Sequence, residues 1–257
     1  MGTLLVLRRM SLVGDAMAHA LLPGAAIGYA LAGFSLTAMG LGGFIAAMLV
    51  AGLAGWVTRV TSQKEDASFA AFYLIALAAG VMIISVRGTS VDLMHVLFGS
   101  ILAVDDVSLL LIASVASATL LVLAVVYRAL VVECFDPGFL KRSDGGRIHF
   151  LFLMLVVANL VSAFQALGTL MAVGMMMLPA VAARFWVAQV WSLSLVAGLI
   201  AVASGFIGLL LSYHANLPSG PAIVLTCGGF YLVSVIAGTR DSLLGRAMSA
   251  RRHRVAA

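Results

Sequence analysis

Two residues that can bind a metal ion, Asp15 and His19, lie in an apolar stretch near the start of the chain. They are four positions apart, so a helix places both side chains on one face, one turn from each other. A carboxylate in hydrocarbon costs about 2.5–3.5 kcal/mol on insertion scales, and it therefore needs a partner or a wet cavity. A carboxylate oxygen and an imidazole nitrogen suit Mn²⁺, Fe²⁺ or Zn²⁺. One helix supplies half of such a site, which other groups or waters must complete.

The same two residues also have a purely structural interpretation. Asp15 follows Gly14 near a predicted helix start, where a carboxylate often caps the first turn. His19 is then a buried neutral histidine bonded to a backbone carbonyl. Both interpretations are open at the level of the residues alone.

Prolines are expected to kink two of the apolar helices. Pro23 and Gly24 follow His19 closely, and Pro179 lies in a later apolar stretch. A proline removes a backbone hydrogen bond, and transporters place ion sites where a helix is interrupted. The alternative is a kink that serves packing alone, because Gly24 and Gly28 form a GxxxG pair.

The elements that must position these residues are membrane-spanning helices. Hydrophobic residues make up 63% of the 257 residues and charged residues only 10%, against about 25% charged residues in soluble domains. A helix that crosses the bilayer needs about 20 apolar residues. We therefore predict an all-α, polytopic transmembrane bundle that forms one domain, 1–257, while 89–101 is too short to cross and lies at or re-enters the surface. The eight predicted spans are 13–34, 38–58, 68–86, 107–127, 149–166, 168–183, 190–213 and 221–238.

The basic residues indicate how these spans are oriented. With Arg8 and Arg9 in the cytoplasm and eight alternating spans, every lysine and arginine except Arg87 falls on the cytoplasmic side. The positive-inside rule therefore supports this multi-pass topology with a cytoplasmic C-terminus. Because this distribution explains the net charge of +5, no nucleic-acid partner is expected.

The longest hydrophilic interruption, 128–148, lies on the predicted cytoplasmic side. Its first part, 128–140, has the composition of a short amphipathic helix broken at Pro137 and Gly138. The segment is either a solvated loop or a docking helix for a cytoplasmic partner.

Missing motifs argue against an enzyme. The chain has no G-x-x-x-x-G-K-[ST], so it does not cradle ATP phosphates by itself, and it has no H-E-x-x-H. An intramembrane aspartyl protease needs two aspartates, and only Asp15 is a candidate. A transporter or a membrane scaffold therefore fits the sequence better.

Several blocks of the chain resemble the manganese/zinc/iron ABC transporter permease family. The blocks are RRMSLVGDAMAHALLPG, KEDASFAAFY, DLMHVLFGSILAV, VSAFQALGTLMAVGMMMLPAVAAR and LPSGPAIVL, and they are spread along the chain from Arg8 to Leu225. The resemblance implies the fold of the vitamin-B12-type import permeases and a bacterial inner-membrane location. It also implies a permease dimer of identical or related subunits, a separate cytoplasmic ATPase, and an extracytoplasmic metal-binding protein.

The resemblance also assigns roles to particular residues. The family's pathway acid and imidazole fall on Asp15 and His19 as metal ligands. Its ATPase-coupling segment falls on 133–140, and the residues that we expect to couple are Glu133, Phe135, Asp136, Pro137 and Gly138. The expected function is the permease subunit of an ATP-driven importer of Mn, Zn or Fe, with no permanently bound cofactor; the alternative is an ion-coupled secondary metal transporter.

The chain departs from the family pattern at three places. Family members usually carry one more spanning helix before the paired arginines, so we expect the natural set of spans to include a further N-terminal helix. Ser100 and Asn216 stand where the family usually has aspartates. Both positions lie on the predicted outer side, so an acidic gate there is weakened.

Overall fold

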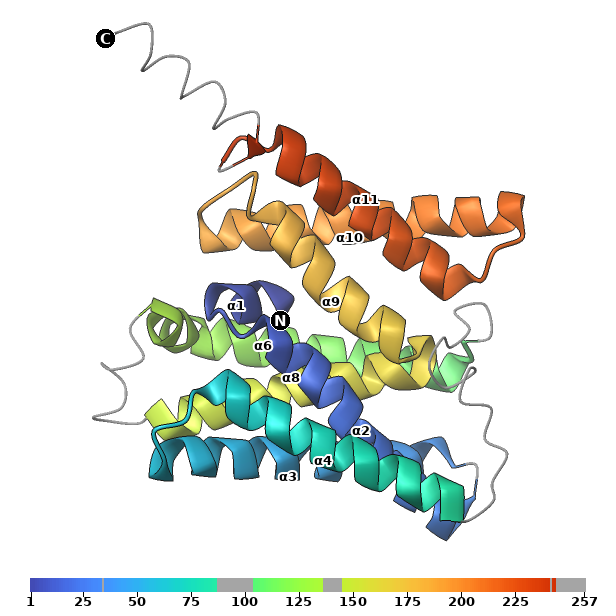
Figure 1. The fold of residues 1–257 in the computed structure, drawn as a ribbon. Coiled ribbons are helices and arrows are strands. Elements are labelled where there is room, and N and C mark those ends of the chain that lie inside the picture. The colour runs from blue at the N-terminus through green and yellow to red at the C-terminus, as the bar shows by residue number, and fades with distance from the viewer. Residues whose placement is uncertain (34, 87–103, 136–144, 241, 244–257) are drawn as a thin grey trace, which may run out of the picture. The chain divides into compact units, whose positions relative to one another are not determined.

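The computed structural model describes residues 1–33, 35–86, 104–135, 145–240, 242 and 243 (Figure 1). Within these residues the regular secondary structure is entirely helical, so the predicted all-α class is confirmed there. The helices, in chain order, are α1 (Gly2–Leu7), α2 (Ser11–Ala32), α3 (Leu36–Val60), α4 (Glu65–Val86), α6 (Asp106–Phe135), α8 (Gly145–Leu167), α9 (Thr169–Ala183), α10 (Val190–Ala215) and α11 (Ser219–Ala237).

Six helices among the described residues are long and apolar enough to cross a membrane. These stretches are Thr37–Thr58, Glu65–Ile83, Asp106–Cys134, Gly146–Leu167, Val190–Ala215 and Ser219–Ala237. The predicted count of eight spans is not confirmed. Predicted spans 13–34 and 168–183 are helices, but the polar Asp15 and His19 lower the hydropathy of α2, and α9 has only 15 residues. The apolar segment 89–101 lies outside the described residues.

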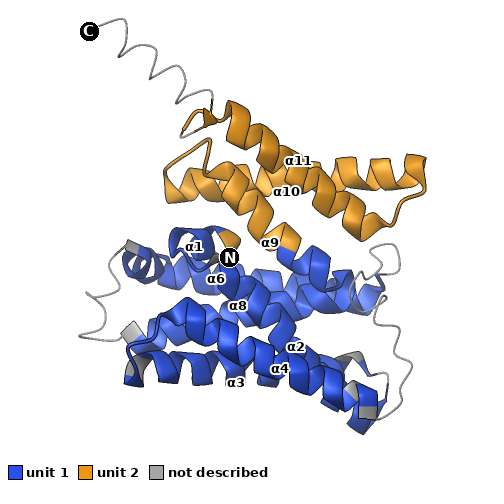
Figure 2. Ribbon diagram, in the orientation of Figure 1, with its two compact units in different colours: residues 1, 3–173 blue, residues 2, 174–257 orange. Residues whose placement is uncertain are grey.

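The chain divides into two compact units (Figure 2). The first comprises residues 1 and 3–173; in it α2 packs against α3 and α4, and α8 packs against α6 and α3. The second comprises residues 2 and 174–257, and α10 packs against α11 within it. That both units belong to one permease domain stays a prediction.

Close backbone contact between α2 and α3 depends on glycines. A Cβ atom placed on Gly24 would lie 2.0 Å from the Gly42 carbonyl oxygen, and one on Gly28 would lie 2.4 Å from the Ala38 carbonyl oxygen. The GxxxG pair predicted from the sequence therefore faces a neighbouring helix, as small residues do in membrane bundles.

Neither predicted proline kink ends its helix. α2 continues through Pro23 to Ala32, and α9 continues through Pro179 to Ala183. On the neighbouring α4, a Cβ atom added to Gly80 would lie 3.0 Å from the Pro23 nitrogen. The helix with the proline is therefore packed tightly at that point.

The segment predicted as the interruption 128–148 is partly helical. α6 runs on to Phe135 and α8 already begins at Gly145, so helix covers 128–135 and 145–148. Within this extension of α6 the Leu130 side chain is fully buried. At its other end, Asp105 caps α6: the Ser108 N–H donates to the Asp105 Oδ1 at 3.1 Å. Hydrogen bonds from Ser108 hold the pKa of this carboxyl below its usual value.

In the second unit, α10 and α11 pack through a glycine. A Cβ atom on Gly208 would lie 2.5 Å from the Ile223 Cα. The loop before α10 is tied to the end of α11, because the Trp186 Nε1–H donates to the Ser234 Oγ at 2.8 Å.

Candidate metal site and the polar cluster

Asp15 and His19 lie on one face of α2, as their spacing predicts. The Asp15 Oδ1 and His19 Nε2 are 3.6 Å apart. Both atoms can therefore contact one ion at the metal–ligand distances of about 2.0–2.2 Å that are usual for such donors. In the isolated chain the Asp15 side chain is 52% exposed and that of His19 is 30% exposed. Both side chains are therefore partly accessible to groups from outside this chain.

The capping interpretation of Asp15 is wrong. α2 begins at Ser11 with Met10 as its N-cap, so Asp15 lies in the second turn, beyond the amides that a cap satisfies. The carbonyl-bonded interpretation of His19 has no support either. Its Nδ1 is buried and has no hydrogen-bond partner among the described residues. Both side chains are therefore left with capacity to bind a ligand.

An aromatic ring covers the imidazole. Tyr73, on α4, stacks on His19 with ring centroids 5.9 Å apart and an interplanar angle of 26°. This contact restricts the plane of the imidazole and so the direction of its Nε2 lone pair. Sequence reasoning missed Tyr73, because no pattern in α4 distinguishes it from other apolar positions that face a helix.

Pro23 alters the backbone beside the pair. In an α-helix the N–H of residue 23 donates to the carbonyl of residue 19, and proline has no N–H. The His19 carbonyl oxygen therefore loses its usual donor. Because helix carbonyls point toward the C-terminal end, this oxygen is directed away from Asp15, which lies one turn before His19.

In the part of the chain that the structure describes, no group of three or more His, Cys, Asp or Glu side chains has the geometry to hold a metal ion. That Asp15 and His19 form half of a site, which other groups complete, stays a prediction.

The predicted ATPase-coupling residues are only partly within the described residues. Glu133 lies near the end of α6, and Phe135 is its last residue, with a side chain that is not described. Asp136, Pro137 and Gly138 lie outside the described residues. The Glu133 side chain is only 6% exposed and forms an ion pair with Arg8, with Arg8 Nη2 2.5 Å from Glu133 Oε2.

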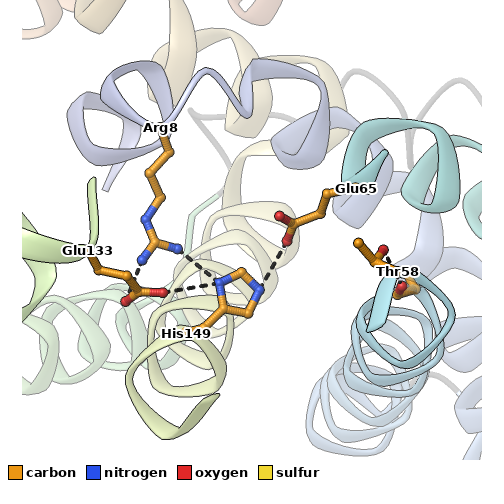
Figure 3. Close-up of polar contacts among 6 residues, drawn as sticks. Arg8, Thr58, Glu65, Glu133 and His149 are labelled. Atoms are coloured by element: carbon orange, nitrogen blue, oxygen red, sulfur yellow. Dashed lines mark hydrogen bonds and ion pairs between the residues drawn. The ribbon is translucent and has the colours of Figure 1, made fainter. Parts of the chain in front are cut away.

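Arg8 and Glu133 belong to a larger polar cluster that sequence reasoning missed (Figure 3). We define the polar cluster as Arg8, Glu65, Glu133 and His149. The His149 Nδ1 lies 3.1 Å from Arg8 Nη1 and 3.3 Å from Glu133 Oε1. The His149 Nε2 lies 3.0 Å from Glu65 Oε1. Four helix ends, those of α1, α4, α6 and α8, thus meet at one place.

The polar cluster is packed against an aromatic side chain. The guanidinium carbon of Arg8 lies 4.1 Å from the centroid of the Phe152 ring, a distance at which a cation is attracted to the ring face. The Arg8 side chain is 5% exposed. One pattern in the sequence indicated this cluster: its four residues all flank predicted spans on the predicted cytoplasmic side.

These features describe a polytopic helical membrane protein with one acid–imidazole pair on a helix of its bundle. Comparison with known proteins then places it: the model of the ABC 3 transport family matches residues 1–238, and the chain belongs to that family.

Individual relatives are similar over most of their length. The chain is 35% identical over 240 residues to the manganese import system permease protein ScaB of Streptococcus parasanguinis, covering 91% of this chain and 82% of ScaB. It is 33% identical over 250 residues to the manganese transport system membrane protein MntC of Listeria innocua, covering 95% and 86%. A probable iron transport system membrane protein of Haemophilus influenzae is 28% identical over 94% of this chain and 85% of that protein.

A solved structure shares the fold. PsaBC from Streptococcus pneumoniae in complex with Fab matches with a TM-score of 0.81 and 29% identity, over 97% of this chain and 88% of that chain. The helical architecture is therefore shared with PsaBC.

Proposed function

We propose that this chain is the membrane-spanning permease subunit of an ATP-binding-cassette importer for divalent transition-metal ions in a bacterial inner membrane. In this proposal α2 and α9 also cross the bilayer, giving eight spans and a cytoplasmic C-terminus. The observation that carries the proposal is the Asp15–His19 pair, which lies inside an otherwise apolar helix with both side chains partly exposed.

The donor set favours a small group of ions. One carboxylate and one imidazole provide mixed oxygen and nitrogen ligands, which suit Mn²⁺ and Fe²⁺ and also accommodate Zn²⁺. The names of the manganese permeases ScaB and MntC support Mn²⁺ as the first ion to test.

Three partners follow from this function. A cytoplasmic ATPase supplies the energy, and its docking segment is 133–140, with Glu133, Phe135, Asp136, Pro137 and Gly138 as coupling residues. An extracytoplasmic metal-binding protein delivers the ion. A second permease, identical or related, completes the half-site, which is consistent with the 52% exposure of Asp15.

The cycle that we propose is alternating access. ATP-driven closure of the ATPases moves the docking segment, and the helices shift so that the site on α2 faces first outward and then inward. Asp15 lowers the cost of a partly dehydrated divalent cation in a medium of low dielectric constant. His19, held by the Tyr73 ring, presents its Nε2 to the same ion.

The test is metal uptake by the reconstituted complex. The permease, its cognate ATPase and its binding protein are placed in proteoliposomes, and ATP-dependent uptake of radioactive Mn²⁺ is measured with Fe²⁺ or Zn²⁺ as competitors. Asp15→Asn is expected to abolish uptake while the complex still assembles. Asp105→Asn, which makes the same chemical change on an exposed carboxylate that caps α6, is the matched control and should retain uptake.

Two results would contradict the proposal. Uptake that survives Asp15→Asn would rule out this site. Uptake by the permease alone, with no ATPase and no ATP, would favour the ion-coupled secondary transporter.

A further inference from the structure

Two charged side chains of the polar cluster, Arg8 and Glu133, are buried inside the protein. Arg8 and Glu133 are 5% and 6% exposed, and their ion pair joins the end of α1 to the end of α6 (Figure 3). A buried charge that loses its partner is strongly destabilising, whereas a surface pair contributes little. The two helix ends are therefore held together more firmly than a solvent-exposed contact would hold them.

His149 contacts both members of the ion pair through one atom. Its Nδ1 is near a group that only donates, the Arg8 Nη1, and near a group that only accepts, the Glu133 Oε1. A ring nitrogen either accepts or donates a hydrogen bond, so it serves one of these partners at a time. The polar cluster thus has two hydrogen-bonding arrangements, one with Nδ1 bonded to Arg8 and one with Nδ1–H donating to Glu133.

The ion pair also connects the two segments that the proposed function requires. Arg8 precedes the first residue of α2, Ser11, by three positions, and α2 carries Asp15 and His19. Between them the backbone turns at Arg9, which has a φ of 59°. Glu133 is the first residue of the proposed docking segment. A displacement of the end of α6 therefore acts on the start of α2 through this buried ion pair.

We infer that Arg8 is the positioning residue that transmits movement of the docking segment to the metal-binding helix. This inference rests on the proposed function. When the docked ATPase moves the end of α6, Glu133 carries the Arg8 guanidinium with it, and the α1–α2 junction follows. The Phe152 ring beneath the guanidinium keeps Arg8 from swinging into solvent, and His149 exchanges its hydrogen bond between the two arrangements as the pair moves.

The experiment measures the number of metal ions imported per ATP hydrolysed. The full complex of permease, ATPase and binding protein is reconstituted in proteoliposomes, and Mn²⁺ uptake and phosphate release are recorded together for each variant. The variants are Arg8→Gln, Glu133→Gln and the double variant. Arg9→Gln, the same change at the adjacent exposed arginine, is the matched control.

We expect Arg8→Gln and Glu133→Gln each to lower the Mn²⁺ imported per ATP by about tenfold, within the roughly 5–150-fold range of known couplings between sites. The double variant should be no worse than either single variant, because both single changes remove the same link. It also leaves no unpaired buried charge, so it keeps the test valid if a single variant fails to assemble. Arg9→Gln should match the unmodified complex.

Three outcomes would overturn the inference or its basis. If the double variant imports as much Mn²⁺ per ATP as Arg9→Gln, Arg8 does not transmit movement. If uptake and ATP hydrolysis fall in equal proportion, leaving the ratio unchanged, the pair is only structural, and the inference fails. If the unmodified complex shows no ATP-dependent uptake, the proposed function itself is wrong, which is a distinct result.

Discussion

Replacing Gly24 by alanine tests the close approach of α2 and α3. The added Cβ would lie 2.0 Å from the Gly42 carbonyl oxygen and 2.7 Å from the Ala46 Cβ. Ordinary contact begins at 3.4 Å, so the oxygen must retreat by about 1.4 Å, the difference between 3.4 and 2.0. Because that oxygen belongs to the backbone of a helix, no rotamer change relieves the clash, and the two helices must separate.

The expected cost follows from two opposing effects. Overpacking costs about 1–3 kcal/mol, and a backbone clash belongs at the upper end. Alanine favours a helix over glycine by about 0.5–1 kcal/mol. The net loss is therefore about 2 kcal/mol, which corresponds to a Tm lower by roughly 4–8 °C for a chain of this length. Metal uptake should fall too, because Gly24 lies just over one turn beyond His19 on the same helix.

The assay is thermal unfolding of the purified permease in detergent, with a matched glycine as the control. Gly52 and Gly55, both on α3, have nothing within 4 Å of an added Cβ. Gly52→Ala and Gly55→Ala should leave the Tm unchanged or raise it slightly. A Gly24→Ala variant that unfolds at the same temperature as Gly52→Ala would refute the reasoning, because α2 and α3 would then not be in backbone contact.

Three further substitutions test the surroundings of the metal pair and the second unit. Pro23→Ala restores an N–H donor to the His19 carbonyl, and because that carbonyl points away from Asp15, we expect Mn²⁺ to bind with unchanged affinity in isothermal titration; weaker binding would show that the backbone at the proline contributes to the site. Tyr73→Ala frees the imidazole and should raise the KM for Mn²⁺ uptake more than it lowers kcat, whereas an equal effect on both would contradict a role in orienting the ring. Gly208→Ala places a methyl group 2.5 Å from the Ile223 Cα. We expect this overpacking to lower the free energy of unfolding by about 1–3 kcal/mol and therefore to lower the Tm; a stabilised variant would argue against this packing.

Local features of α2 were predictable from the sequence. A spacing of four fixes the common face of Asp15 and His19 whatever surrounds them, and Gly24 and Gly28 are spaced for a helix contact by the same periodicity. The start of α2 at Ser11 was less predictable, because nothing before Asp15 in the sequence rules out a helix that begins there. That boundary excludes Asp15 as a helix cap.

The polar cluster was not predictable, for a physical reason. Arg8 and His149 are 141 positions apart, and each flanks an apolar stretch where a polar residue is expected to be solvated. Their burial depends on how α1 lies against α6 and α8, which is a property of the tertiary structure. Likewise, no local pattern shows that α6 runs on to Phe135 or that Leu130 is buried.

The length of α6 has a consequence for the bilayer around it. Its 30 residues rise about 45 Å, while the hydrocarbon core is about 30 Å thick. The helix must therefore tilt, project beyond the core, or do both. Glu133 lies near one end of this helix, so the depth at which the polar cluster sits is set partly by the lipids. Membrane thickness then becomes a mechanical variable that acts on the same end of the helix as the proposed docking segment.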